Sequence, residues 1–323
     1  MEKERLEIFR ERVFGDKLNA TFDFVRENWR PMLKYMTYMM LPLACVAGVL
    51  MKGWMSYYMN MMVAKQQNPE VGFIVSYGLT ILVYVFASLL LASLVYSMMR
   101  IYRERKDRLK DLTYEELKPT FWRFLKRMLL LGLCFLVLYI LAFLLIILIA
   151  TLTLWSLLLT VPALIILAMP LLYWPPAYLL DDDLSLFAAL KKSYRLGFPT
   201  WGGIFLIALV LGMLSMVISS VVSIPWSVGF FSYLMLSEAG EGQAPVVMEF
   251  VMYLLNVVQS YCTLVVSSLS LVGMAFQYGH AADKIDGITV ERNIENFEHL
   301  GDNNVDAPDV MGMNSEFDDF DKL

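Results

Sequence analysis

The chain has 323 residues, of which 58% are apolar and 18% are charged, and its formal net charge is −5. Soluble domains average roughly 45–50% apolar and about 25% charged residues. A soluble domain of this length could not hide so large an apolar surplus, so the composition indicates a membrane protein. It also excludes a disordered chain, a collagen and a small disulfide-rich scaffold.

Intervals without charged residues locate the membrane spans. The long ones are residues 35–51, 71–99, 128–180, 196–237 and 250–282. About 20 residues cross a hydrocarbon core, so the interval 128–180 should form two spans with a turn near 151–156. We therefore predict an all-α, polytopic integral membrane protein with six transmembrane helices, because backbone groups in lipid must be hydrogen-bonded internally. The predicted spans are 33–52, 72–99, 126–150, 156–180, 200–224 and 248–279.

These spans divide the chain into three parts. Residues 1–32 are predicted to form a cytoplasmic amphipathic segment, residues 33–282 the six-span domain, and residues 283–323 a tail. The tail holds 12 acidic and 3 basic side chains, a composition typical of disordered segments. An amphipathic stretch with a Trp precedes the first, third and fifth spans, which suggests three repeats of an amphipathic helix and a helical hairpin. Ordinary membrane-flanking sequence is the alternative interpretation.

The distribution of Lys and Arg predicts the orientation. Of the 26 basic residues, 24 fall in the two termini and in segments 100–127 and 181–199, which alternate with the other connections. Basic residues concentrate in cytoplasmic loops of membrane proteins. Both termini are therefore expected in the cytoplasm, and the lipid bilayer is the expected environment of the six spans.

The sequence shows no catalytic constellation, cofactor motif or nucleic-acid-binding pattern. Its two histidines are His280 and His299, and neither has a partner at metal-ligand spacing. Asp283 follows His280 by three residues, and a surface pair between them is the expected arrangement. No catalytic residue, metal ligand or cofactor is therefore predicted, and no nucleic acid is expected as a partner.

Two features of the spans allow a structural or a functional interpretation. Pro162, Pro170, Pro175 and Pro176 break the fourth span, and the freed carbonyls could bind a substrate. A kink absorbed by neighbouring helices is the favoured reading. Small and polar residues also recur at helical spacing in the fifth span (Gly212, Ser215, Ser219, Ser223) and the sixth (Asn256, Ser260, Thr263, Ser267, Ser270, Gln277). We predict that these two faces pack on each other, with a hydrophilic pore lining as the alternative.

Residues 181–198 are predicted to form an amphipathic cytoplasmic helix. On a helical wheel Lys191, Lys192 and Arg195 share one side, as candidate contacts for anionic lipid headgroups. Leu186, Leu190 and Tyr194 lie on another side, which should face the spans or the acyl boundary. An ordinary cytoplasmic loop is the alternative, and the acidic run that precedes the helix could pair with its basic residues.

This region resembles a bacterial group of six-span membrane domains, which includes the membrane domain attached to some glycerophosphodiester phosphodiesterases. The resemblance lies in residues 175–181 (PPAYLLD) and 188–196 (AALKKSYRL). It implies a multi-pass protein of a bacterial inner membrane. The resemblance lies in the membrane domain and not in the phosphodiesterase catalytic domain of the longer members, so it implies no catalytic residue. We expect a non-catalytic binding or membrane-organising protein, with a carrier of lipids or apolar molecules as the alternative and an intramembrane enzyme third.

Overall fold

The computed structural model describes residues 6–64, 71–105, 107–152, 156–181, 184–238 and 246–289, and all regular secondary structure in these ranges is helical. The α-helices are α1 (Phe14–Ala64), α2 (Val71–Glu104), α3 (Tyr114–Leu152), α4 (Leu157–Ala168), α5 (Trp174–Leu180), α6 (Leu186–Gly197), α7 (Trp201–Glu238) and α8 (Val246–Asp286). A 3₁₀-helix, η2 (Met169–Tyr173), joins α4 to α5.

Six stretches are long and apolar enough to cross a membrane, which confirms the predicted fold class. They are Phe14–Met51, Val71–Glu104, Tyr114–Thr151, Leu158–Leu180, Trp201–Ser232 and Val247–Asp286. The first and third are longer than the predicted spans because the preceding amphipathic segments are continuous with them, whereas the second, fifth and sixth continue past their predicted ends. In α1 a non-helical residue, Asn28, marks the change from amphipathic segment to apolar span, and its side-chain amide donates to the Phe24 carbonyl.

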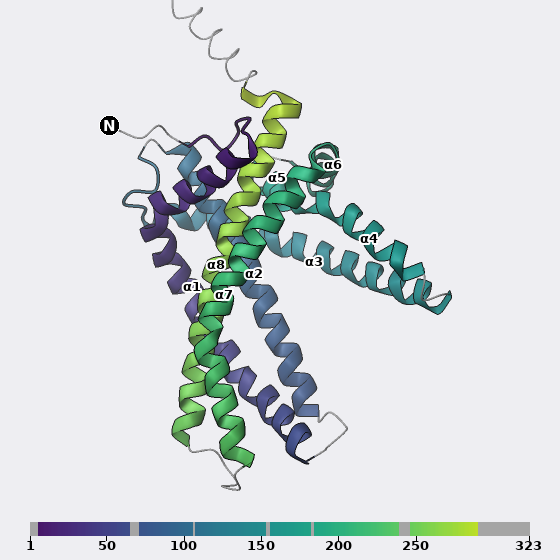
Figure 1. Cartoon of the computed structure of the whole chain (residues 1–323). Helices are drawn as coiled ribbons and strands as arrows, with labels where there is room; N and C mark the ends of the chain where they lie inside the picture. The colour runs from purple at the N-terminus through teal and green to yellow at the C-terminus, as the bar shows by residue number, and fades with distance from the viewer. Residues whose placement is uncertain are drawn as a thin grey trace, which may run out of the picture.

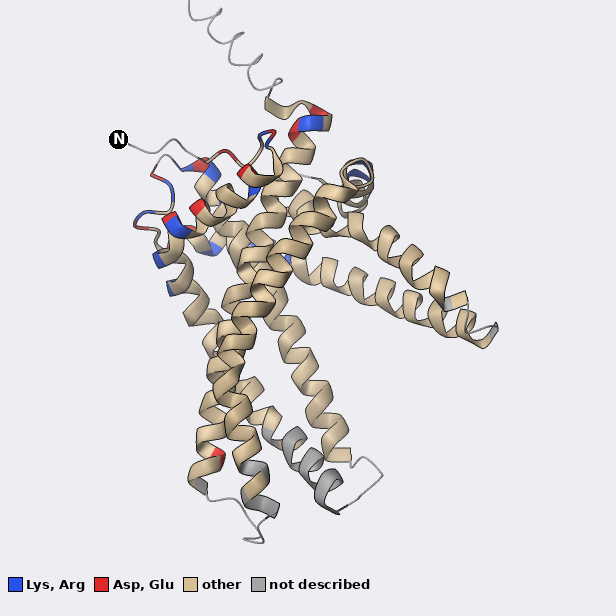
Figure 2. Cartoon of the chain, in the orientation of Figure 1, with Lys and Arg blue, Asp and Glu red and all other residues tan. Residues whose placement is uncertain are grey.

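Four helices, α1, α2, α7 and α8, form a bundle, whereas the hairpin of α3 and α4 diverges from it (Figure 1). Within the bundle α8 packs against α1, α2 and α7, and α1 also packs against α2. Charged side chains gather at the end of the bundle where α6 and the N-terminal segment lie (Figure 2). This one-sided distribution agrees with the alternation of basic segments along the sequence.

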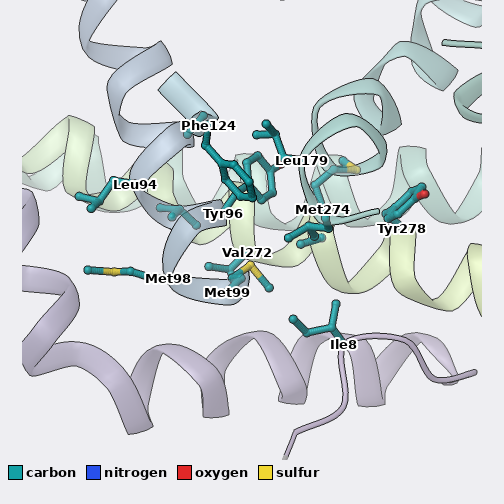
Figure 3. Close-up of a cluster of buried hydrophobic side chains, with 14 of the residues drawn as sticks. Ile8, Leu94, Tyr96, Met98, Met99, Phe124, Leu179, Val272, Met274 and Tyr278 are labelled. Carbon is teal, nitrogen blue, oxygen red and sulfur yellow. The ribbon is translucent and has the colours of Figure 1, made fainter. Parts of the chain in front are cut away.

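The apolar core lies at the charged end of the molecule (Figure 2), where α1, α2, α3, α5, α6, α7, α8 and η2 contribute buried residues. Figure 3 shows side chains from the N-terminal segment, α2, α3, α5 and α8 interlocking there, among them Ile8, Tyr96, Phe124, Leu179 and Met274. Each of these side chains is buried. The core therefore joins the bundle to the base of the hairpin. Far from the core α7 still contacts α8, where Gly229 lies against Met252, while the α3–α4 hairpin diverges from the bundle (Figure 1).

Beyond this core the hairpin exposes its side chains. Leu131 is the last buried residue of α3, and Gly132 lies against Leu89 of α2. None of the residues in the most apolar window of α3 is buried inside the protein, and most side chains of α4 are exposed too. The hairpin thus presents apolar surface on nearly all sides, as a helix in direct contact with lipid can.

Two boundaries differ from the prediction. Residues 6–13 form a non-helical strap that crosses the end of α8, and α1 begins at Phe14. At the other end α8 continues to Asp286, so Asp283 and Asp286 belong to a helix and not to the acidic tail. Residues 290–323 of that predicted tail lie outside the described residues.

Candidate functional site

The break in the fourth span is the first part of the candidate site. Proline has no N–H, so Pro170 leaves the carbonyl of Ile166, four residues earlier, without its helical donor. The indole Nε1–H of Trp201 donates to that carbonyl over 3.3 Å. A freed backbone acceptor in the fourth span is therefore already satisfied by a side chain from the start of the fifth.

Two further carbonyls at the same break accept hydrogen bonds from α6. The Tyr194 hydroxyl donates to the Leu167 carbonyl at 3.3 Å, and the Ser193 hydroxyl donates to the Pro170 carbonyl. Burial raises the pKa of the Tyr194 hydroxyl, which keeps this donor protonated. Gly197 of α6 lies so close to Pro170 that a Cβ there would collide with the proline ring. The interruption of the span is thus the surface on which α6 docks.

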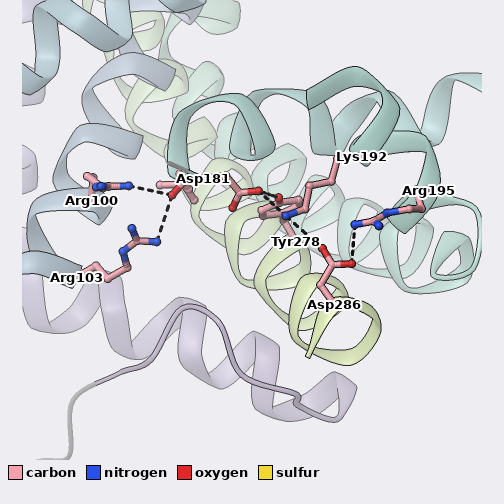
Figure 4. Close-up of polar contacts among 8 residues, drawn as sticks. Arg100, Arg103, Asp181, Lys192, Arg195, Tyr278 and Asp286 are labelled. Atoms are coloured by element: carbon pink, nitrogen blue, oxygen red, sulfur yellow. Dashed lines mark hydrogen bonds and ion pairs between the residues drawn. The ribbon is translucent and has the colours of Figure 1, made fainter. Parts of the chain in front are cut away.

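An ion-pair cluster joins α5, α6 and α8 beside this break (Figure 4). The Lys192 ammonium lies 2.7 Å from the Asp181 carboxylate and 3.2 Å from that of Asp286. Arg195 pairs with Asp286 at 2.6 Å, and the Tyr278 hydroxyl donates to Asp181 at 2.6 Å. Two basic and two acidic groups therefore compensate each other where three helices meet.

Three arginines from α2 and α3 satisfy the last carbonyls of α5. Arg100 and Arg103 donate to the Leu180 carbonyl at 3.1 and 3.2 Å, and Arg127 donates to the Tyr178 carbonyl at 3.0 Å. The last carbonyls of a helix lack helical donors and carry partial negative charge, which cations complement. The short helix α5 is consequently tied to the bundle through α2 and to the hairpin through α3.

The three predicted lipid-contact residues occupy different surroundings. Lys191 is exposed and makes no ion pair among the described residues. Lys192 is committed to Asp181 and Asp286, as the alternative reading of the acidic run allowed, and Arg195 is committed to Asp286 while its side chain stays 58% exposed. Contact with anionic headgroups remains a prediction, for which Lys191 and Arg195 have the accessible side chains.

The predicted pair between His280 and Asp283 is replaced by contacts with the N-terminal strap. His280 Nδ1 accepts the backbone N–H of Arg12 at 3.1 Å. Asp283 accepts the backbone N–H groups of Glu11 and Thr289, each at 2.8 Å. Sequence spacing brought the two side chains to one helix end, but the unpaired N–H groups of an extended strap compete for them.

Packing of the fifth and sixth spans is confirmed, but the predicted faces are wrong in part. Gly212 is exposed, and nothing lies within 4 Å of a Cβ built on it. In α8 the polar stripe turns toward α1 and α2: Asn256 donates to Met51 Sδ, and Ser260 shares a hydrogen bond with Tyr84. The two helices approach closely at three glycines instead. Gly203 and Gly229 of α7 lie against side chains of α8, and Gly273 of α8 lies against a side chain of α7.

Gln277 has a different role from the one expected. Its amide donates at 3.0 Å to the hydroxyl of Tyr173 in η2, which also contacts Thr200 at 3.1 Å. The polar stripe of α8 therefore ends by fixing the broken fourth span to the bundle. Sequence reasoning missed this contact, because Tyr173 and Gln277 are 104 residues apart in the chain. It also missed the three arginines, because a carbonyl acceptor leaves no residue signature; the prolines were the available signal.

The described residues contain no group of three or more His, Cys, Asp or Glu side chains that could hold a metal ion. The chain matches no family model, no curated protein and no solved structure. The three carbonyls at the break accept hydrogen bonds from side chains of the protein, and the adjoining hairpin exposes most of its apolar length.

Proposed function

We propose that the chain is a multi-pass protein of a bacterial inner membrane, with both termini in the cytoplasm, that acts as a non-catalytic binding or membrane-organising protein. The segregation of 24 of 26 basic residues to alternate segments supports the orientation. The resemblance of residues 175–181 and 188–196 to six-span bacterial domains supports the location.

The α3–α4 hairpin is the observation that carries the binding role. Its base is held by the contacts of Arg127 and Trp201, whereas its length beyond Leu131 exposes apolar side chains. Because its base is anchored and its apolar side chains are exposed, the hairpin can bind lipids or other membrane components while its position relative to the bundle stays fixed. We infer that the hairpin is the binding surface of the protein.

The carrier alternative depended on freed carbonyls along the fourth span. The carbonyls of Ile166, Leu167 and Pro170 already accept hydrogen bonds from the side chains of Trp201, Tyr194 and Ser193. A substrate would have to displace three donors, of which Tyr194 and Ser193 also hold α6 and Trp201 the start of α7. This arrangement favours a structural role for the break.

Site-specific photo-crosslinking in native membranes tests the binding role. A benzophenone amino acid is placed at Leu136 or Leu144 on the hairpin and, as the matched control, at Met216 on the exposed face of α7. We expect the hairpin positions to capture a reproducible membrane component that the α7 position does not. The same adducts at all three positions would mean that the hairpin meets bulk lipid only, and the proposal would fail.

Cysteine labelling tests the orientation separately. In a chain whose Cys45, Cys134 and Cys262 are replaced by Ala, Gln66→Cys and Gln243→Cys should react with an impermeant maleimide in intact spheroplasts. A cysteine at Lys118, in a predicted cytoplasmic segment, should react after lysis only. The reverse pattern would invert the topology.

A further inference from the structure

Lys17, in the first turn of α1, is a buried lysine. Only 5% of its surface is exposed. It makes no ion pair or side-chain hydrogen bond among the described residues. Burial of an ammonium group without a counterion is strongly unfavourable, so lysines at such places normally have a carboxylate beside them. Lys17 therefore has no carboxylate partner in the part of the chain that the structure describes.

The groups that face Lys17 add positive charge and donors. Lys284, near the end of α8, lies close enough to repel it, and His280 lies within electrostatic range of both lysines. His280 Nδ1 accepts the Arg12 N–H, so the neutral imidazole carries its proton on Nε2, which is a donor. The packing of α1 on α8 agrees with this placement, because Thr21, one turn after Lys17, lies 3.5 Å from a Cβ built on Gly273 of α8. Lys284 follows His280 by one turn of α8, so the three residues belong to the same stretch of the contact between α1 and α8.

The acidic groups nearby are engaged elsewhere. Asp283 accepts N–H groups from Glu11 and Thr289 through its two oxygens. Asp16 and Glu11 are exposed, and their electrostatic interactions are with Arg12 and His280. Among residues 6–64 and 246–289, the strap that carries Glu11 and Arg12 across α8 therefore supplies no carboxylate to Lys17.

We propose that Lys17, Lys284 and His280 form a binding site for a phosphate group, carried by free phosphate or by a lipid headgroup. A phosphate offers three or more acceptor oxygens and up to two negative charges, which match two ammonium groups and one N–H donor. The site lies where α1 and α8 meet, on the bundle and away from the hairpin (Figure 1). It goes beyond the proposed function and does not depend on it.

Thermal unfolding of the full-length protein in detergent tests the site. The ligands are sodium phosphate, with sodium chloride at equal ionic strength as control, and dihexanoyl phosphatidate, with dihexanoyl phosphatidylcholine as control. We expect the melting temperature to rise and saturate with one ligand beyond its control, because a ligand of the folded state stabilises it. A rise with phosphate indicates the free ion, and a rise with phosphatidate alone indicates the headgroup. No rise beyond the controls overturns the proposal.

Variants decide whether these residues are responsible. Lys17→Met should weaken the apparent affinity by about tenfold or more, the value of a charge-assisted hydrogen bond. Without ligand it should fold at least as stably, because it removes a buried charge. Lys284→Gln, at an exposed position, should weaken binding with an unchanged fold, and Lys118→Met on α3 should bind as the unaltered chain does. Full affinity in Lys17→Met would overturn the assignment.

Discussion

The indole N–H of Trp201 donates to the carbonyl of Ile166, the acceptor that Pro170 leaves without a helical donor. A proline in one span and a tryptophan opening the next are thus two halves of one interaction. This hydrogen bond holds the fourth span at a fixed angle to the fifth, and hence sets the direction of the hairpin. The break in the fourth span is a structural joint whose stability can be measured.

Replacing Trp201 by Phe should destabilise this joint. The ring can still stack on Phe205, as the indole does now, but the Ile166 carbonyl loses its donor. We expect a loss of about 0.5–2 kcal/mol in the free energy of unfolding, measured by denaturant or steric-trap unfolding in detergent. Trp122→Phe is the matched control, because Trp122 is an exposed tryptophan of α3. Equal losses in the two variants would contradict the role of the hydrogen bond.

The ion pair between Asp181 and Lys192 should show measurable coupling. Their side chains are 11% and 18% exposed, and both lie where α5, α6 and α8 meet. A double-mutant cycle of Asp181→Asn and Lys192→Met should give a coupling free energy of about 0.5–3 kcal/mol. Each single variant leaves a partly buried charge with one partner fewer. The two single losses of unfolding free energy should therefore add up to more than the loss in the double variant.

The pair of Arg105 and Glu116 is the control for this cycle. Its atoms are 3.1 Å apart, but the side chains are 29% and 49% exposed. Exposed ion pairs contribute about 0–1 kcal/mol because solvent screens them. If both cycles gave the same coupling, the cluster at α6 would be no more than a surface feature.

The six spans were predictable from the sequence because the cost of placing charge in lipid leaves long charge-free intervals. Helix α6 was predictable because its apolar and basic residues recur at helical spacing, and the structure adds Ser185 as its N-cap. The contacts of Ile166 and Leu180 were not, because any donor can satisfy a backbone carbonyl. Nor was the strap: His280 and Asp283 look like a pair until Glu11 and Arg12 are placed beside them in space.

Two leucines of α3 should distinguish the base of the hairpin from its length. Leu131 is 1% exposed in the core, whereas Leu136 is 53% exposed. Leu131→Ala leaves a cavity in close-packed protein and should cost about 2–5 kcal/mol in unfolding free energy. Leu136→Ala should cost less than about 1 kcal/mol, since lipid or detergent replaces the lost contacts. A large loss at Leu136 would mean that the hairpin packs on protein.

A pair of glycines tests the contact between the strap and α8. Gly279 lies directly against the backbone carbonyl of Ile8, so a Cβ there must push the strap away. Gly279→Ala should therefore expose the buried side chains of Ile8 and Phe9 and lower the melting temperature, and limited proteolysis should cut residues 6–13 more readily. Gly212→Ala is the opposite case. With nothing within 4 Å of its Cβ, it gains only helix propensity and should stabilise the protein by about 0.5–1 kcal/mol. A strap that resists proteolysis in Gly279→Ala would show that Ile8 can shift without leaving α8.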